Sequence, residues 1–199
     1  SFYLEKIDNH VLKNIVLIDK NKCGKEFLDD KIIKDIDDIN ETPIENVINR
    51  NEMTSWAYVL FTSGSTGEPK GAITRHDGAM NHIFAEFKVM ELMDKFNFLQ
   101  SANIGSDISV WQILSPLMIG GTVVIIDKYD VLDYAKVTDI IEKHNVNLVE
   151  FVPSYIFGLL NYIESLTAIP KFHSLKRLMF TGEVVSVKMI NLIKILFAK

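Results

Sequence analysis

The sequence predicts an α/β fold, a doubly wound and largely parallel sheet flanked by helices. From residue 96 onward, short runs of β-branched and aromatic residues alternate with longer amphipathic stretches. This succession is typical of parallel sheets, because two parallel strands need a crossover connection, usually a helix, between them. The composition is that of a globular chain, since 48% of the 199 residues are hydrophobic and 24% are charged.

The first part of the chain, residues 1–54, is predicted to be a peripheral α/β segment followed by an acidic connection. Residues 14–19 form an apolar run that favours a short buried strand, and residues 25–39 favour a short helix. Residues 37–54 are acidic and rich in asparagine, which favours an exposed connection. The α/β core is therefore expected in residues 55–199.

The core is predicted to open with two β-prone runs, residues 56–61 and 72–74, on either side of a loop rich in glycine and hydroxyl groups. An amphipathic helix over residues 78–93 follows, with Asp77 as its N-cap. The later strands are expected at 96–102, 122–126, 146–152 and 175–180, and the later helices at 108–118, 133–145, 153–166 and 186–197. Ligands of such sheets bind where strands end, so the strand-to-helix turns are the candidate sites.

Charge and cysteine content exclude several classes of protein. The net charge is -5 and basic residues are not clustered, which argues against nucleic acid and anionic membranes as partners. The only cysteine is Cys23, so no disulfide framework exists and a reducing compartment fits. The longest apolar stretch, residues 113–126, contains a proline and two glycines and is too short to span a bilayer. We predict a cytoplasmic protein. Because residue 1 is Ser and the last helical pattern runs uncapped to the end, we also expect a piece of a larger polypeptide.

The loop between the first two core strands has the chemistry of a phosphate site. Its glycines let backbone N–H groups converge on an anion, and its hydroxyls donate further hydrogen bonds. Lys70 adds a mobile positive charge. The alternative is a flexible surface turn. The Walker pattern is excluded, because it needs another glycine–lysine spacing and a helix after it.

The segment from Thr62 to Lys70 resembles the T-S-G-[ST]-T-G-x-P-K-G signature of the adenylate-forming enzymes. These are the amino-acid adenylation domains of nonribosomal peptide synthetases, the acyl-CoA synthetases and the luciferases. The resemblance implies that Thr62 and Lys70 are catalytic. It implies an ATP-binding set made of Thr62, Ser63, Gly64, Ser65, Thr66, Gly67 and Lys70.

The turn after strand 96–102 strengthens the resemblance. Residues 107–111, Asp-Ile-Ser-Val-Trp, are similar to the F-D-x-S-V-W segment of peptide-synthetase adenylation domains, although Ser106 stands where the family usually has Phe. In that family the Asp pairs with the α-ammonium of the bound amino acid, and a charge-assisted hydrogen bond suits this task. From the residues alone, a helix N-cap is the favoured interpretation of Asp107. The resemblance makes Asp107, Ile108 and Trp111 substrate-binding residues.

The two later turns complete the predicted site. Glu150 falls at a strand position that lines the substrate side chain in the family, and such a glutamate would favour a polar or basic amino acid; the alternative is a solvent-facing edge position. Residues 178–184 resemble the strand and G-G-E-A-L turn beside the nucleotide base. This adds Met179 and Thr181 to the substrate site, and Gly182 and Glu183 to the ATP site. Ordinary core packing is the alternative for Met179.

The resemblance covers residues 56 to about 185 and implies an internal fragment of the large N-terminal part of an adenylation domain. The implied activity is ATP-dependent activation of an amino acid and its transfer to a phosphopantetheine thiol, in secondary metabolite biosynthesis. The implied cofactors are ATP and Mg²⁺, whose protein ligand is expected outside this chain; no metal ligand is assigned here. Implied partners are the amino acid and the peptidyl carrier and condensation domains of the same synthetase. The alternatives are an acyl- or aryl-CoA synthetase, and a degenerate scaffold domain.

Overall fold

The computed structural model describes residues 14–17, 32–35, 48–62, 68–92 and 94–197. The chain divides into two compact units, Ser1–Arg50 and Asn51–Lys199, and each is described by itself.

The first unit contains two short parallel strands. Strand β1 (Asn14–Leu17) pairs with β2 (Ile32–Asp35), with Asn14 opposite Ile32. The expected helix at residues 25–39 is therefore wrong over its described part. Residues 32 and 33 are both isoleucine, and β-branched residues favour the extended conformation that pairs with the apolar run of β1.

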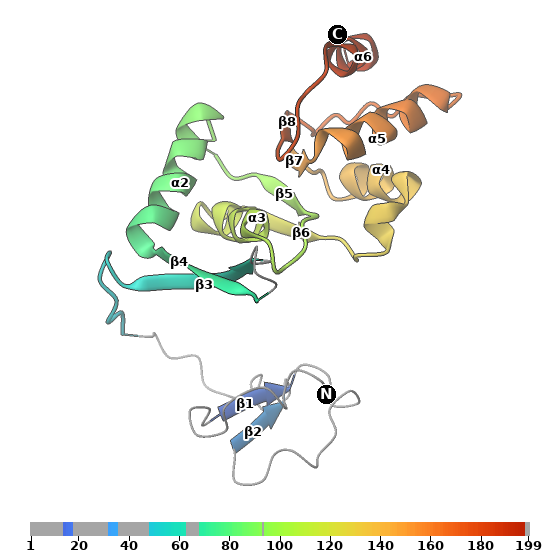
Figure 1. The fold of residues 1–199 in the computed structure, drawn as a ribbon. Coiled ribbons are helices and arrows are strands. Elements are labelled where there is room, and N and C mark those ends of the chain that lie inside the picture. Colours follow the sequence, from blue (N-terminus) through green and yellow to red (C-terminus); the bar gives the residue numbers. More distant parts are fainter. Residues whose placement is uncertain (1–13, 18–31, 36–47, 63–67, 93, 198–199) are drawn as a thin grey trace. The chain divides into compact units, whose positions relative to one another are not determined.

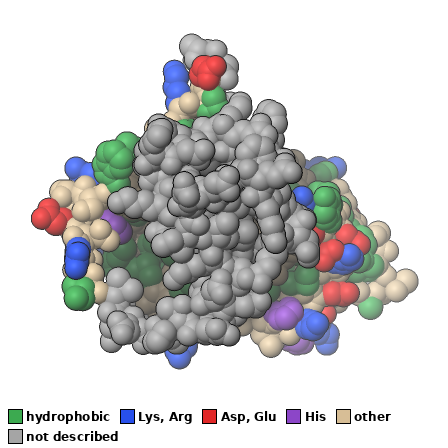
Figure 2. All heavy atoms as spheres, turned by 90° about the horizontal axis from the view of Figure 1, so that it is seen from below, with side chains coloured by type: hydrophobic (Ala, Val, Ile, Leu, Met, Phe, Trp, Pro, Cys, Tyr) green, Lys and Arg blue, Asp and Glu red, His purple; other side chains and the backbone are tan. Residues whose placement is uncertain are grey.

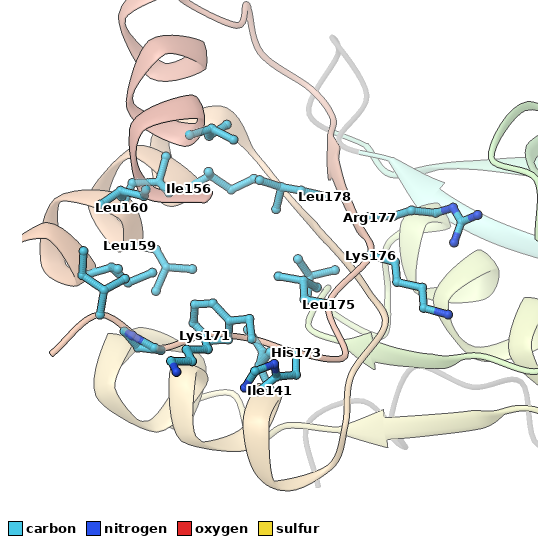
Figure 3. A pocket seen from close by; sticks show the side chains of 17 residues that line it. Ile141, Ile156, Leu159, Leu160, Lys171, His173, Leu175, Lys176, Arg177 and Leu178 are labelled. Carbon is cyan, nitrogen blue, oxygen red and sulfur yellow. The ribbon is translucent and has the colours of Figure 1, made fainter. Parts of the chain in front are cut away.

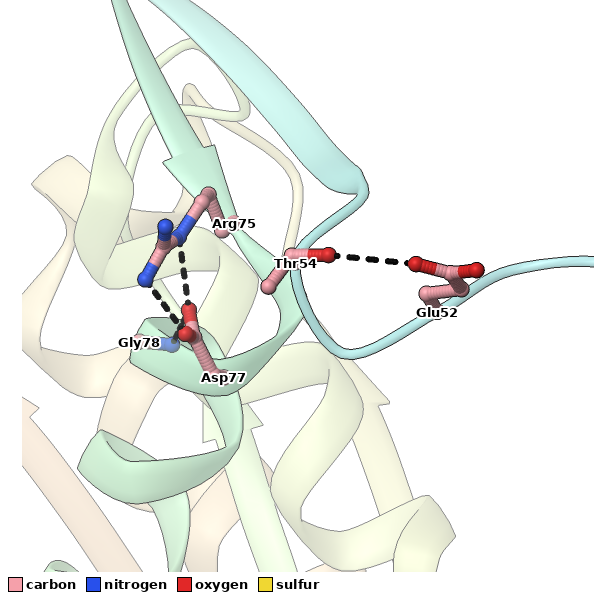
Figure 4. A network of polar contacts seen from close by, with 5 residues as sticks. All are labelled: Glu52, Thr54, Arg75, Asp77 and Gly78. Atoms are coloured by element: carbon pink, nitrogen blue, oxygen red, sulfur yellow. Dashed lines mark hydrogen bonds and ion pairs between the residues drawn. The ribbon is translucent and has the colours of Figure 1, made fainter.

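The second unit begins with an antiparallel hairpin. Strand β3 (Trp56–Thr62) pairs with β4 (Lys70–Arg75), which leads directly into helix α2 (His76–Val89). The helix begins two residues before its predicted start, and Arg75 is its N-cap position. Asp77 instead accepts hydrogen bonds from Arg75 Nε at 3.1 Å and Arg75 Nη2 at 2.5 Å, and from the Gly78 N–H at 2.8 Å (Figure 4). In the same region Thr54 Oγ1 donates to Glu52 Oε2 at 3.5 Å.

The rest of the unit is a four-stranded parallel sheet with helices on both faces (Figure 1), as the sequence predicted. Its strand order is β6-β5-β7-β8. The elements are β5 (Asn97–Gln100), α3 (Asp107–Met118), β6 (Thr122–Ile125), the 3-10 helix η4 (Asp130–Leu132), α4 (Tyr134–Lys143), β7 (Leu148–Phe151), α5 (Pro153–Ser165), β8 (Arg177–Phe180) and α6 (Val187–Phe197).

The two faces of the sheet carry two separate cores. On one face, Leu99 and Val149 pack with α4, α5 and α6 in a cluster that includes Leu160. On the other face, Phe98 and Leu148 pack with α2 and with Trp111 of α3. Because successive side chains of a strand point to opposite faces, Glu150 lies on the same face as Leu148, toward α2 and α3.

The amino ends of the strands are held by side-chain hydrogen bonds. Asn147 Oδ1 accepts from the Asn97 N–H at 2.7 Å, and Asn147 Nδ2 donates to the Ser174 carbonyl at 3.0 Å. Arg177 Nε donates to the Met90 carbonyl at 2.5 Å, which ties β8 to the end of α2. These contacts fix the strand register at the amino ends of the strands. The carboxyl ends lead into the turns that carry the candidate site residues.

Candidate active site

The strand order places a candidate site between β5 and β7. These neighbours lead to β6 and β8, which lie on opposite sides of the pair. The turns that follow β5 and β7 therefore diverge, and a crevice at such a switch point is the usual ligand site of open α/β sheets. Three of the turns that sequence reasoning selected, after β5, β7 and β8, belong to this edge of the sheet.

A buried glutamine holds this edge together. Gln112 of α3 is fully buried, and its Oε1 accepts from the backbone N–H groups of Ser101 and Ala102, both at 3.0 Å. Ser101 Oγ donates to the Glu150 carbonyl at 3.1 Å, and Gln112 Nε2 approaches the same carbonyl at 3.5 Å. The turn after β5 is thereby fixed to both α3 and β7. Sequence reasoning missed Gln112, although a glutamine in an otherwise apolar helix pattern is a signal for such a role.

Asp107 is the first residue of α3 and is exposed. Ser106 is the N-cap, and its Oγ accepts from the Ile108 N–H at 3.3 Å, so the capping alternative for Asp107 is not needed. Asp107 Oδ1 accepts from the same N–H at 3.0 Å and from Ser106 Oγ at 3.3 Å. Oδ2 accepts no hydrogen bond from the described residues. An exposed carboxylate with such an oxygen can bind an external cation.

Glu150 is the second carboxylate of the edge, and only 6% of it is exposed. The solvent-facing alternative for this residue is therefore wrong. Burial raises the pKa of the Glu150 carboxyl to about 7, the facing amide of Gln112 lowers it, and the charge of Glu86 raises it further. Trp111 also approaches Glu150 closely enough to lower the pKa of this carboxyl. Nevertheless, the buried atoms Glu150 Oε2 and Trp111 Nε1 form no hydrogen bond of good geometry with the described residues. Unmet buried groups of this kind cost free energy, and they are often matched by a ligand.

Two of the other predicted substrate residues, Met179 and Trp111, lie next to this carboxylate. Met179 stands opposite Glu150 in the register of β7 and β8, and it packs against the cluster that contains Trp111. Ile108 lies one helical turn before Trp111 and is half-buried. Thr181 follows β8, and its N–H donates to the Phe151 carbonyl at 3.3 Å. The structure thus brings Glu150, Trp111 and Met179 together, with Ile108 and Thr181 at neighbouring positions of the same elements.

Gly182 and Glu183, predicted to bind ATP, form the turn after β8. Gly182 has φ of 78°, a left-handed conformation that favours glycine. The Glu183 carboxylate accepts from the Ser154 N–H at 2.8 Å and from Ser154 Oγ at 2.9 Å, and so caps the start of α5. Sequence reasoning did not foresee this contact, which joins residues 29 positions apart and fixes the β8 turn to the β7 turn.

The predicted phosphate loop joins the strands of the β3–β4 hairpin. Thr62 and Lys70 are paired across its end, both are exposed, and Thr62 Oγ1 donates to the Lys70 carbonyl at 3.4 Å. The two strands on either side of this segment agree with the prediction. The predicted ligands Ser63, Gly64, Ser65, Thr66 and Gly67 lie outside the described residues.

A mainly apolar cavity lies elsewhere. A cavity of about 470 Å³ is lined by aliphatic side chains of α4, α5, α6, β7 and β8, on the face opposite Glu150. Figure 3 shows Leu159, Leu160 and Ile156 around it, while Lys176 and Arg177 extend away from it. Its lining is mostly aliphatic; it includes Lys171 and His173 but no carboxylate, so we do not place the chemistry there.

Metal binding, membrane spanning and surface charge were also considered for the described residues. Within the described ranges, no group of three or more His, Cys, Asp or Glu side chains is arranged to hold a metal ion. No helix in the described part of the chain combines the length and apolarity needed to cross a bilayer. On the described surface visible in Figure 2, basic and acidic side chains are interspersed.

Comparison with known proteins connects this geometry with a family. The model of the family described as AMP-binding enzyme matches residues 4–199. Nonribosomal peptide synthetase dtxS1 of Metarhizium robertsii is 33% identical over 144 residues, which are 72% of this chain and 2% of that protein. Cyclosporin synthetase simA of Tolypocladium inflatum is 30% identical over 168 residues, 83% of this chain and 1% of that protein. The chain thus spans only a few per cent of the length of these relatives.

Solved structures share the fold. The nonribosomal peptide synthetase FmoA3 in an AMPPNP-bound form matches with a TM-score of 0.79 at 17% sequence identity. The match covers 92% of this chain and 19% of the FmoA3 chain. McyG A-PCP complexed with phenylalanyl-adenylate matches with a TM-score of 0.71 at 21% identity, and the match covers 85% of this chain and 27% of the McyG chain. O-succinylbenzoate coenzyme A synthetase of Bacillus subtilis, in complex with ATP and magnesium, has a TM-score of 0.72 at 18% identity, with 98% and 39% covered. The predicted resemblance to adenylate-forming enzymes is confirmed.

Proposed function

We propose that this chain, which belongs to the AMP-binding enzyme family, is the phosphate- and amino-acid-binding part of a nonribosomal-peptide-synthetase adenylation domain. The proposed reaction forms an aminoacyl adenylate from ATP and an amino acid and releases pyrophosphate. The aminoacyl group then passes to the phosphopantetheine thiol of a carrier domain in the same synthetase. The relatives dtxS1 and simA support this assignment.

The observation that carries the proposal is the pair of carboxylates at the switch point. Asp107 is exposed, and its Oδ1 accepts the Ile108 N–H. Glu150 is buried, its pKa is raised in part by the charge of Asp107, and its Oε2 forms no hydrogen bond of good geometry with the described residues. An α-amino acid fits this arrangement, because its ammonium can pair with Asp107 while its side chain enters toward Glu150. A fatty or aryl acid has no ammonium and would leave Asp107 without a partner.

The residues of the chain would act mainly by positioning and by charge stabilisation. With the ammonium on Asp107, the substrate carboxylate is oriented toward the nucleotide. One carboxylate oxygen attacks the α-phosphorus of ATP, and the bond from that phosphorus to the bridging oxygen of pyrophosphate breaks. Lys70 and the hydroxyl of Thr62 would hold the departing phosphates, since an ammonium and a hydroxyl suit phosphate oxygens. Mg²⁺ is expected to accompany the nucleotide, and no step is assigned to it here.

The turn after β8 would form part of the nucleotide site. Glu183 is engaged with Ser154 at the start of α5, so its carboxylate contributes by holding the turn in place. Gly182 leaves room beside the turn for a ligand, since it has no side chain. We therefore propose Gly182 as a position of close approach to the nucleotide and Glu183 as the residue that fixes this turn.

The test is amino-acid-dependent exchange of labelled pyrophosphate into ATP, measured on the full-length natural protein that carries this sequence. We expect exchange with at least one α-amino acid and labelling of the carrier thiol by that amino acid. Exchange that depends on a fatty or aryl acid would favour an acyl-CoA synthetase. ATP binding without exchange across all acids tested would favour a scaffold role and contradict the proposal.

A further inference from the structure

The turn between β8 and α6 is fixed at its first residue and has little packing beyond it. It comprises residues 181–186. The Thr181 N–H donates to the Phe151 carbonyl at 3.3 Å, which continues the pairing of β8 with β7. The next five residues, 182–186, are all exposed, and Val184 is exposed to 94%. Because side-chain packing contributes so little here, the position of this turn must depend on a few directed contacts.

The start of α5, in contrast, is anchored firmly in the core. Pro153 is its first residue and is buried, and Ile156 in the same turn of the helix is fully buried. The Tyr155 ring stacks on the Phe151 ring with the centroids 4.4 Å apart, and its hydroxyl donates to the Val131 carbonyl at 2.6 Å. A helix start with these packed and hydrogen-bonded contacts can serve as a rigid support for a neighbouring exposed segment.

Ser154 connects this rigid helix start to the exposed turn. Its N–H donates to Glu183 Oε2 at 2.8 Å, and its Oγ donates to Glu183 Oε1 at 2.9 Å. The N-cap residue Val152 makes no side-chain cap hydrogen bond, so the Glu183 carboxylate caps α5 instead. Hydrogen bonds to a carboxylate are stronger than those between neutral groups. An added Cβ atom at Gly182 would lie 3.7 Å from Val152 Cγ1, so the two turns run close together.

We propose that Ser154 is a positioning residue of the nucleotide site. By holding the Glu183 carboxylate, it sets the path of the turn that offers Gly182, with φ of 78°, to the nucleotide. Ser154 acts through Glu183 and does not itself touch the nucleotide. This inference rests on the proposed function, because it assumes that the turn after β8 borders the nucleotide. A residue that only capped α5 would affect stability alone, whereas a positioning residue should also change nucleotide affinity.

The experiment measures binding of the non-hydrolysable ATP analogue AMPPNP, in the presence of Mg²⁺, by titration calorimetry on the full-length natural protein. The variants are Ser154→Ala, Ser154→Thr, Glu183→Ala and the double variant Ser154→Ala/Glu183→Ala. The matched control is Asp133→Ala, because Asp133 caps α4 by accepting from the Ala135 N–H at 3.0 Å and the Lys136 N–H at 3.4 Å. The melting temperature of each variant is measured alongside. Binding needs no amino acid, so the result does not depend on whether the protein activates one.

Ser154→Ala should raise the Kd of AMPPNP about threefold to tenfold, and Glu183→Ala should raise it about tenfold. Ser154→Thr keeps the hydroxyl, so its Kd should stay within about twofold of the wild-type value. The double variant should bind no more weakly than Glu183→Ala, because both changes break the same linkage. Asp133→Ala should lower the melting temperature and leave the Kd unchanged.

A wild-type Kd in Ser154→Ala, or additive losses in the double variant, would overturn the inference. An equal loss of affinity in Asp133→Ala would overturn it too, since that would mark a general effect of lost stability. Failure of the wild type to bind AMPPNP would overturn both proposals. The expected changes in Kd, combined with no pyrophosphate exchange for any amino acid, would support the inference and contradict the proposed function.

Discussion

The two faces of the parallel sheet have the same architecture but different chemistry. Strand β7 is buried along its whole length, with Val149 and Phe151 toward α4 and α5 and Leu148 and Glu150 toward α2 and α3. A strand buried on both faces is normally apolar throughout. On β7, only the α2–α3 face carries a buried carboxylate, and it lies beside an indole N–H that makes no hydrogen bond of good geometry with the described residues. Stability does not explain this arrangement, because buried unmet polar groups oppose folding.

The cavity between the sheet and helices α4, α5 and α6 leads to the same conclusion about the two faces. This cavity lies on the apolar face, yet its lining is mostly aliphatic and includes no carboxylate, and Lys176 and Arg177 extend away from it (Figure 3). Function is better indicated by polar groups whose hydrogen bonds are incomplete than by volume. Variants on the α2–α3 face should therefore change substrate recognition, whereas variants on the other face should change only stability.

The largest expected effect is that of Asp107→Asn on activity. Loss of the carboxylate leaves the α-ammonium without its counterion, so we expect kcat/KM for pyrophosphate exchange to fall by a factor of roughly 100 to 1,000 in the full-length protein. Because Asp107 is exposed, the melting temperature should hardly change. Wild-type exchange rates in this variant would show that the crevice is not the ammonium site.

Leu160→Ala should lower stability and leave substrate preference unchanged. Leu160 is 2% exposed and belongs to the core between the sheet and α5. Its truncation should destabilise the fold by about 2–5 kcal/mol, seen as a lower melting temperature. The order of preference among amino acids should stay as in the wild type. A changed preference would mean that the two faces are not functionally separate.

Glu150→Gln should show a stability effect that depends on pH. The pKa of Glu150 is about 7 in the folded protein, above its ordinary value of 4.5. The cost of burying it is therefore absent below pH 4.5, grows as the pH rises, and is complete above about pH 7. Without substrate, the variant should gain stability over the wild type by on the order of 2–3 kcal/mol at pH 8. Thermal melts at pH 5 and pH 8 measure this, and equal differences at the two pH values would contradict the buried-acid assignment.

Lys70→Ala tests the hairpin, which belongs to neither face. Lys70 is exposed at the start of β4, so its removal should leave the melting temperature within a degree or so. If Lys70 contacts the phosphates, the exchange rate should fall about tenfold to 100-fold for every amino acid alike, with no change in preference. A change of preference would place Lys70 in the amino-acid site instead.

The order of elements could be predicted because periodicity is a local property of the sequence. The alternating strands and helices after residue 96 are found as expected, with ends that differ by a few residues. A local pattern also led to the wrong start and the wrong N-cap for α2. Asp77 was expected to cap the helix, but Arg75 precedes it and pairs with its carboxylate (Figure 4).

The candidate site was predicted only where a residue stands in a recognisable turn. Gln112 was missed because its role depends on tertiary contacts. It accepts hydrogen bonds from the turn before its own helix and approaches the Glu150 carbonyl of β7. Glu183 was assigned to the nucleotide, but its hydrogen bonds are with Ser154. Such contacts are set by tertiary packing, and no local pattern reports them.

The measurement that tests the central claim most directly is discrimination between an amino acid and the same acid without its α-amino group. Both are assayed by pyrophosphate exchange with the full-length protein and its Asp107→Ala variant, using the amino acid that the wild type activates best. We predict that the wild type favours the amino acid by at least roughly 100-fold and that the variant loses most of this preference. Equal activation of both acids by the wild type would contradict the assignment of the α2–α3 face as an amino-acid site.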